Sequence, residues 1–209
     1  NLDLEWQEAW RNREGHTPVM QHNNPEIVRM IAETWIHDAQ KALQAGVRPA
    51  FYAFAPTDWR NNAHPLYSSV FFTQKVVAYL ANHHRTASLE VFRNGGWIAV
   101  HAATYEQPVD FDPHRPDGTI WDMTLRGYEI VLEAFEQHFG DDLAVDEIPV
   151  ASTEGGVFTP NSTSMAGHDR LRTDEEHARR VVEMFEWLEA NTQLFAMCPW
   201  CLSVGPLIG

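Results

Sequence analysis

The chain has 209 residues, of which 44% are hydrophobic and 21% charged, a composition typical of a globular protein large enough to bury a core. Its formal net charge of -14 argues against nucleic acid as a partner, because a grip on phosphate backbones needs clustered lysine and arginine. The same charge disfavours anionic membrane surfaces, and no apolar run approaches the length of a membrane span.

Strands and helices are predicted to alternate from the start of the chain. The first predicted strand is Leu2–Glu8. Asn24 then caps a helix that has Pro25 at its first position, runs to about Ala45 and is stopped by Gly46. The apolar residues of this helix recur at helical spacing, at Ile27, Ile31, Trp35, Ala39 and Leu43.

The middle of the chain continues the alternation. The continuous apolar run Pro49–Ala55 is typical of a strand buried on both faces. A helix is predicted from about Tyr67 to His83, and Ser88–Arg93 resembles an added turn. After two glycines, Trp97–Ala102 predicts another strand, which a long loop rich in proline and aspartate follows, over 103–118.

The last third of the chain adds two helices and two strands. The predicted elements are a helix over 119–139 ended by Gly140, a strand over Ile148–Ser152, a helix to Ala190 and a strand over Leu194–Cys198. Thr173 and Glu176 form a capping box at the start of the second of these helices. Its inward-facing positions are expected to be Ala178, Val181, Val182, Phe185 and Leu188.

Strict alternation of five strands and four helices predicts a parallel sheet covered by helices, in a single α/β domain over residues 1–209. A closed (β/α)8 barrel typically takes about 250 residues and eight strands. The chain is therefore expected to be the C-terminal portion of a longer barrel, or an open sheet. Both architectures place chemistry at the C-terminal ends of the strands.

Each of two predicted strands has a glutamate at its C-terminal end or just after it. Leu4-Glu5-Trp6-Gln7-Glu8-Ala9 resembles the Asn-Glu-Pro strand end of the large clan of retaining glycoside hydrolases with (β/α)8 barrels. The stretch from Val150 to Gly156, with Glu154 near its end, resembles the nucleophile strand of that clan. Trp97–Ala102 resembles strand 6, and Leu194–Trp200 resembles strand 8. The resemblance implies a TIM-type barrel of which this chain covers about strands 4 to 8.

The resemblance also implies roles for individual residues. Glu154 would be the nucleophile after strand 7, and Glu8 the acid/base after strand 4. Retaining enzymes hold these two carboxyl groups about 5–5.5 Å apart, which is the separation expected here. The remaining expected substrate-binding residues are His101, Trp200, Gln7, Trp6, Trp59 and Tyr105. No cofactor and no metal ion are expected for this chemistry.

Other functions fit parts of the sequence. The acidic loop after His101 would suit a metal-dependent sugar isomerase, through Glu106, Asp110, Asp112, His114 and Asp117. Gln7 and Ala9 replace the usual asparagine and proline of the acid/base motif, which leaves open a barrel that binds carbohydrate without cleaving it. In each case the partner is a carbohydrate, and a missing N-terminal half-barrel or a second chain is expected to close the barrel, because five strands leave open edges.

Overall fold

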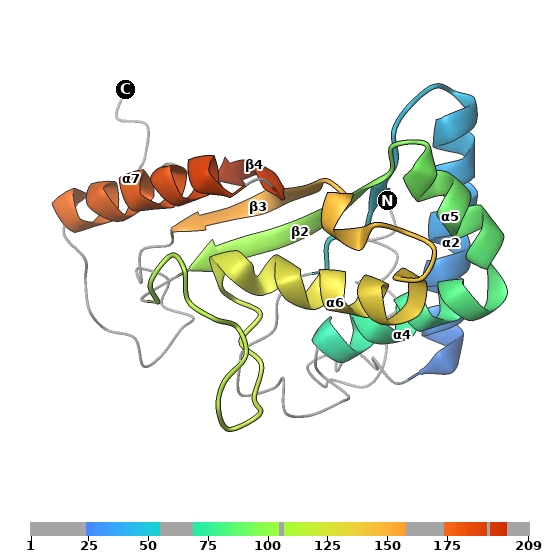
Figure 1. Cartoon of the computed structure of the whole chain (residues 1–209), viewed down its shortest axis with the longest axis horizontal. Helices are drawn as coiled ribbons and strands as arrows, with labels where there is room; N and C mark the ends of the chain where they lie inside the picture. The colour runs from blue at the N-terminus through green and yellow to red at the C-terminus, as the bar shows by residue number, and fades with distance from the viewer. Residues whose placement is uncertain (1–23, 55–68, 105–106, 158–173, 192, 200–209) are drawn as a thin grey trace, which may run out of the picture.

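The computed structural model describes residues 24–54, 69–104, 107–157, 174–191 and 193–199. Within them, four parallel strands form one sheet whose spatial order follows the chain, β1-β2-β3-β4 (Figure 1). The strands are β1 (Ala50–Phe51), β2 (Trp97–Thr104), β3 (Val150–Val157) and β4 (Leu194–Pro199). The predicted α/β class and the parallel sheet are confirmed. The predicted strand Leu2–Glu8 lies outside the described residues.

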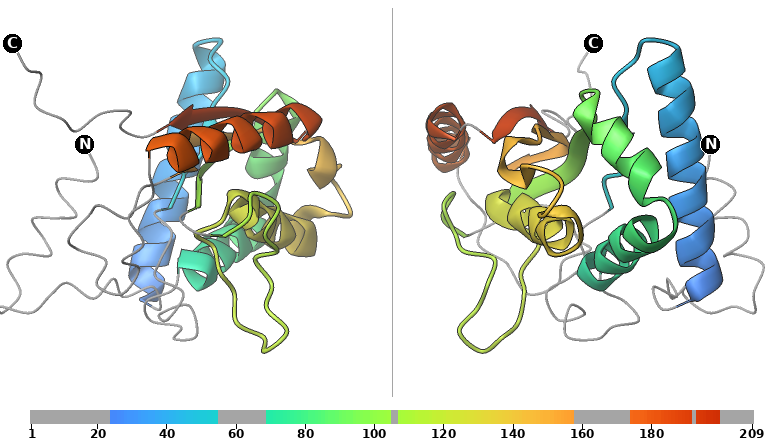
Figure 2. Two further views of the ribbon diagram at one scale, coloured as in Figure 1. Left: turned by 90° about the vertical axis from the view of Figure 1, so that its left-hand side faces the viewer. Right: turned by 45° about the vertical axis from the view of Figure 1, so that its right-hand side comes forward.

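Helices connect the strands. They are α2 (Pro25–Gln44), α4 (Ser69–His83), α5 (Arg85–Arg93), α6 (Tyr128–Phe139) and α7 (Asp174–Ala190), with 3-10 turns η1 (Leu125–Gly127) and η2 (Val145–Glu147). The helix α4 packs between α2 and α6, so that these three lie side by side (Figure 2). The helix α7 packs against β3 and β4 instead. No helix of the described ranges is long and apolar enough to cross a bilayer.

The helix α2 begins and ends where its sequence indicates. The Asn24 side chain accepts a hydrogen bond from the backbone N–H of Glu26 at 3.0 Å, and Pro25 fills the first helical position. The helix ends beside Gly46, whose φ of 75° suits glycine. Its buried stripe is Val28, Ile31, Ala32, Trp35, Ile36 and Ala39.

One apolar core joins these helices to one face of the sheet. Its centre is a set of aromatic rings in which Phe51 lies 5.4 Å from Trp35 and 5.0 Å from Phe135 between ring centroids. Phe92 closes the set, 5.8 Å from Trp35 and 5.1 Å from Phe135. The Trp35 indole N–H donates to the carbonyl of Ala50 at 2.8 Å, which satisfies its buried polar atom. The sheet contributes Ile98, Val100, Ala102, Val150 and Leu194 to the same core.

Several predicted boundaries differ from the structure. The strand β1 has two residues rather than the whole run Pro49–Ala55, and residues 85–93 form a helix rather than a turn. The helix predicted from Thr119 starts only at Tyr128, because Asp117 and Thr119 close a turn and His114 forms an isolated bridge with Ile120. Asp and Thr side chains compete with helical hydrogen bonding in this way.

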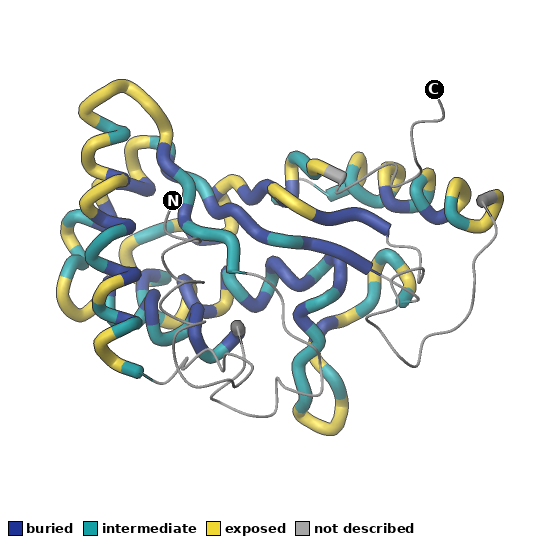
Figure 3. The backbone as a smooth tube through the Cα atoms, turned by 180° about the vertical axis from the view of Figure 1, so that it is seen from behind, coloured by how far each residue is buried: buried dark blue, intermediate teal, exposed yellow. Residues whose placement is uncertain are grey.

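The inward face predicted for α7 is only partly correct, because Val181 and Leu188 pack against the core as predicted but Val182 and Phe185 are exposed. Val182 and Phe185 are 55% and 50% exposed, whereas Met184 is 1% exposed and packs with Leu125 and Val157. Figure 3 shows buried and exposed segments interleaved along α7. Apolar residues occupy adjacent positions in this helix, so helical spacing alone is consistent with two different buried faces. The contacts with Leu125 and Val157 select the Met184 face.

Candidate functional site

The strand β3 contains one more residue than its neighbours. Ser152 lies opposite Val100 on β2, but the next residue of β2, His101, lies opposite Glu154, so that Thr153 is the extra residue of a β-bulge. The register towards β4 shifts in the same stretch of β3. Bulges of this kind re-aim a side chain, and they are over-represented beside active sites. Thr153 and Glu154 are both exposed in an otherwise buried strand.

Ser152 holds the bulge together. Its side chain is fully buried, and its hydroxyl accepts a hydrogen bond from the backbone N–H of Ala102 at 2.9 Å. The same hydroxyl donates to the backbone carbonyl of Glu154 at 2.7 Å. A hydroxyl that both accepts and donates can thus bridge the point where the extra residue interrupts the backbone ladder. The backbone of Glu154 is fixed by a neighbouring side chain as well as by the sheet.

Gly155 and Gly156 follow Glu154, and each of the two positions favours glycine for a different reason. A Cβ on Gly155 would lie 2.0 Å from the carbonyl oxygen of Ala102, so that no side chain fits there. Gly156 has a φ of 110°, which disfavours other residues. Both glycines lie inside β3, which runs to Val157 rather than ending at Ser152 as predicted.

His101 and Glu154 point to the face of the sheet opposite the helical core. Residues paired across parallel strands lie on the same face, and Val100 and Ala102, on either side of His101, belong to the core. The residues of this face closest to His101 and Glu154 are small, namely Ala99, Ala103, Ala151, Gly156 and Ala196, whereas Trp97 lies on the same face at the start of β2. Glu154 and His101 therefore lie among small residues on this face, with Glu154 exposed and His101 half-buried.

The sequence predicted Glu154 and His101 at strand ends, and the structure corrects this. Glu154 lies inside β3, which continues to Val157, and His101 lies inside β2, which continues to Thr104. The physical reason is the bulge, because it absorbs the extra residue and lets pairing continue beyond it. Both residues remain in the C-terminal halves of their strands, near the edge where parallel sheets bind ligands.

A small cavity of about 40 Å³ lies on the other side of His101. The strand β1 ends at Phe51, so that the chain from Tyr52 leaves β2 before it reaches His101. The cavity occupies this region, between the β1 exit and the first turns of α4 and α6. Among the described residues, the polar ones that line it are Tyr52, Thr73, His101 and Asp122.

Asp122 is a candidate that the sequence analysis missed. It is only 8% exposed and lies in the loop between β2 and α6. The preceding Trp121 donates its backbone N–H to the carbonyl of Pro113 at 2.8 Å, and Arg115 stacks on the Trp121 ring. A Cβ on Gly127 would come within 2.1 Å of the Asp122 carbonyl, so the turn is tightly closed. The only sequence signal is an aspartate next to the apolar pair Ile120 and Trp121.

Burial also perturbs Tyr52 beside this cavity. Its pKa is raised above the ordinary phenol value, chiefly by desolvation and further by the negative charge of Asp38. The Tyr52 hydroxyl is therefore a neutral hydrogen-bonding group at physiological pH. Thr73, another residue that lines the cavity, is 4% exposed.

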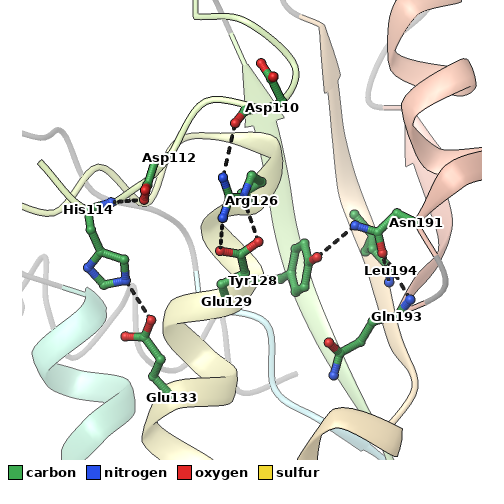
Figure 4. A network of polar contacts seen from close by, with 10 residues as sticks. All are labelled: Asp110, Asp112, His114, Arg126, Tyr128, Glu129, Glu133, Asn191, Gln193 and Leu194. Carbon is green, nitrogen blue, oxygen red and sulfur yellow. Dashed lines mark hydrogen bonds and ion pairs between the residues drawn. The ribbon is translucent and has the colours of Figure 1, made fainter.

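Polar side chains of the acidic loop after β2 form contacts with other residues of the same loop and of α6 (Figure 4). Asp112 accepts from the backbone N–H of His114 at 2.8 Å, and the His114 ring lies 2.6 Å from the Glu133 carboxylate on α6. Asp117 accepts from both the N–H and the hydroxyl of Thr119. In the ranges that the structure covers, no three His, Cys, Asp or Glu side chains group as metal ligands would. Glu106 lies outside those ranges.

The structure brings His101 to Glu154 and leaves the other predicted site residues undescribed. Glu8, Gln7, Trp6, Trp59, Tyr105 and Trp200 all lie outside the described residues. The separation of about 5–5.5 Å between Glu8 and Glu154 stays a prediction. Cys198 is a free, exposed cysteine on β4.

The described fold defines a class: an α/β protein with a parallel sheet and a bulged strand that carries a glutamate beside a histidine. Comparison with protein-family models, with curated protein sequences and with solved structures finds no match for the chain. The case for a function therefore rests on the geometry of the site.

Proposed function

We propose that the protein is a retaining glycoside hydrolase in which Glu154 is the nucleophile. The observation that carries the proposal is the pairing of His101 with Glu154 across β2 and β3, on a face floored by small residues. Such a face leaves room for a ring-shaped substrate, and the pair lies in the C-terminal halves of parallel strands. The bulge held by Ser152 turns Glu154 away from the core and towards that space.

The order of the sheet supports a barrel. The strands follow one another in chain order, and α2, α4 and α6 pack consecutively. An open doubly wound sheet reverses its order at a switch point, for example as 3-2-1-4-5-6, whereas successive units of a (β/α)8 barrel do not. We propose that β1 to β4 correspond to strands 5 to 8 of such a barrel, with Leu2–Glu8 as strand 4.

Further strands or a second chain would complete the proposed barrel. The sheet of the described residues has β1 and β4 at its edges, and edge strands need covering. Large apolar side chains are also exposed near the β4 side, with Phe195 on β4 60% exposed and Phe185 on α7 50% exposed. Additional units packed there would bury them.

The proposed chemistry needs two carboxyl groups in opposite protonation states. Ionised Glu154 forms a bond to the anomeric carbon while protonated Glu8 donates its proton to the leaving oxygen. Glu8 then takes a proton from water, which attacks the same carbon and releases Glu154.

The test is hydrolysis of a panel of aryl glycosides by the intact protein. Glu154→Gln is expected to lower kcat by several orders of magnitude with little change in folding, because the amide cannot act as the nucleophile. Glu147→Gln, at an exposed glutamate in η2, is the matched control and should keep full activity. Full activity of Glu154→Gln, or a product of inverted anomeric configuration by NMR, would rule the mechanism out.

A barrel that binds carbohydrate without cleaving it is the second candidate, favoured by Gln7 and Ala9 in the motif around Glu8. Sugar binding in calorimetry without turnover, in wild-type protein, would support it. The metal-dependent isomerase gains no support from the described part of the acidic loop, where Asp112 and Asp117 stabilise turns. Activity that is lost with a chelator would favour the isomerase.

A further inference from the structure

The helix α7 has a second apolar face, which the core does not cover. Its first face is buried, with Met184 only 1% exposed. On the second face Val182 and Phe185 are 55% and 50% exposed, and the smaller Ala178 is exposed as well. We call these three residues the outer face of α7. Single exposed apolar side chains are common, but a row of them along one helix indicates a surface that packs against something else.

The spacing of the apolar residues fits a second helix. Ala178, Val181, Phe185 and Leu188 recur at intervals of three and four residues, and Val182 lies beside them. This repeat forms the seam along which one helix packs against another. Val181 and Leu188 are half-buried because they also contact the core. The seam therefore continues from the buried face to the outer face over residues 178–188, about 15 Å of helix at 1.5 Å per residue.

The position of α7 makes its outer face accessible. The helix packs on β3 and β4, at the opposite end of the molecule from α2 (Figures 1 and 2). Within the described residues, β4 is also an edge strand of the sheet. A partner can therefore reach the outer face without displacing the core.

The charges beside the outer face are negative. Glu175 and Glu189 lie seven residues before and after Val182, about two helical turns in each direction, so that both flank the seam on its exposed side. Glu186 is exposed as well. The exposed Arg179 forms an ion pair with Glu183 within the helix. A partner that complements this surface therefore carries positive charge beside its own apolar residues.

The same charges decide between the possible occupants. Acidic flanks repel nucleic acids and anionic membrane surfaces. A second copy of the chain would bring another glutamate-flanked seam against this one, and each chain has a net charge of -14. A helix with an apolar seam and basic flanks matches both the spacing and the charge of α7.

We propose that the outer face of α7 is a docking surface for an amphipathic helix of another protein, with lysine or arginine beside its apolar seam. The apolar residues of the partner pack on Ala178, Val182 and Phe185, and its basic residues pair with Glu175 and Glu189. The surface does not include His101 or Glu154, so this inference does not depend on the proposed glycosidase activity.

The test uses a synthetic peptide of about 18 residues, or five helical turns, with leucine at the seam positions and lysine beside them. A second peptide has the same composition in an order that removes the seam. Binding to the intact, isotope-labelled protein is measured by NMR titration. The seam peptide should bind at least about tenfold more tightly than the second peptide and shift the amide signals of α7. Equal binding of the two peptides, or shifts that spare α7, would overturn the proposal.

Variants separate the apolar seam from general charge attraction. Phe185→Ser should weaken binding of the seam peptide by at least about tenfold. Val47→Ser changes an apolar residue that is 58% exposed beyond the end of α2 and should leave binding unchanged. The double variant Glu175→Gln and Glu189→Gln should weaken binding and reduce its salt dependence, whereas Glu90→Gln on α5 should do neither. Equal effects of Phe185→Ser and Val47→Ser would contradict the role of the outer face.

Sedimentation of the protein without peptide tests the rival occupant. Wild type and Phe185→Ser should sediment alike at the concentrations of the titration, because a second copy does not cover the outer face. Self-association of wild type that Phe185→Ser abolishes would assign the surface to a second copy and overturn the proposal.

Discussion

His101 on β2 lies directly opposite Glu154 on β3, and the bulge at Thr153 accounts for this pairing. Without a bulge, the strict alternation of a strand would set Thr153 against His101 and turn Glu154 into the helical core, on the side of Val100. The bulge therefore decides whether the carboxylate faces solvent or apolar side chains.

Removing the Ser152 hydroxyl should destabilise the sheet. Ser152→Ala leaves the buried N–H of Ala102 without its acceptor, at a cost of about 1–3 kcal/mol in the free energy of unfolding. Ser88→Ala is the matched control, because Ser88 is equally buried but its hydroxyl has no hydrogen-bond partner within the described structure. The control should be neutral or slightly stabilising, since alanine favours the helix. Urea denaturation measures both, and equal effects would contradict the bridging role of Ser152.

Gly155 should tolerate no side chain. In Gly155→Ala the new Cβ meets the Ala102 carbonyl at 2.0 Å, so the two strands must separate. We expect a loss of more than about 3 kcal/mol, or failure to fold. Gly118→Ala is the comparison: its φ is 82° but nothing lies within 4 Å, so it should cost only about 1–2 kcal/mol. Thermal unfolding followed by circular dichroism ranks the two variants, and the reverse order would be inconsistent with the close packing of β2 and β3.

Asp117 should contribute to stability in a way that depends on pH. The hydrogen bonds from Thr119 hold the pKa of its carboxyl below the ordinary value, aided by the charge of Arg115. A carboxyl whose pKa is lower in the folded state stabilises above the unfolded value, about 3.9, and that contribution is lost as the pH falls through the folded pKa. Asp117→Asn should remove this part of the acid destabilisation, whereas Asp141→Asn, in the exposed turn after α6, should not. Denaturation midpoints between pH 5 and 2 test the difference.

The pair of Tyr128 and Asn191 should link α6 to the end of α7. The Asn191 side-chain amide donates to the Tyr128 hydroxyl at 2.8 Å, and the Asn191 carbonyl oxygen accepts from the backbone N–H of Gln193 and of Leu194 (Figure 4). Tyr128→Phe should cost about 1 kcal/mol, and Asn191→Ala more, because it also releases the start of β4. A double-mutant cycle measured by urea unfolding should give a coupling energy of about 0.5–1.5 kcal/mol. Strict additivity would show that the contact adds nothing.

The sequence predicts the fold well where local signals agree. Asn24, Pro25 and Gly46 define the ends of α2 because capping and backbone freedom are local properties. The order of strands and helices follows from periodicity in the same way. The length of β3 cannot be predicted in this way. The close approach of Gly155 to the carbonyl of Ala102 becomes visible only in the folded structure. The face of α7 also depends on tertiary contacts, those of Met184 with Leu125 and Val157.

The candidate site is predicted only in part for a similar reason. Glu154 and His101 stand out because each follows an apolar run. Asp122 does not stand out in the sequence, because it becomes a candidate only through its burial beside the end of β1. The sequence predicts a longer β1 than the two residues that form it. A buried acid is visible only when the elements around it are assembled.

The extra residue in β3 also has a mechanical effect. A bulge bends its strand and increases the local twist, and designed sheets use such points to introduce curvature. At Thr153 the bend coincides with the carboxylate, so the curvature of the sheet and the direction of Glu154 come from the same residue. A change in the length of β3 at this point would therefore alter the shape of the surface under a bound ligand together with the chemistry that it presents.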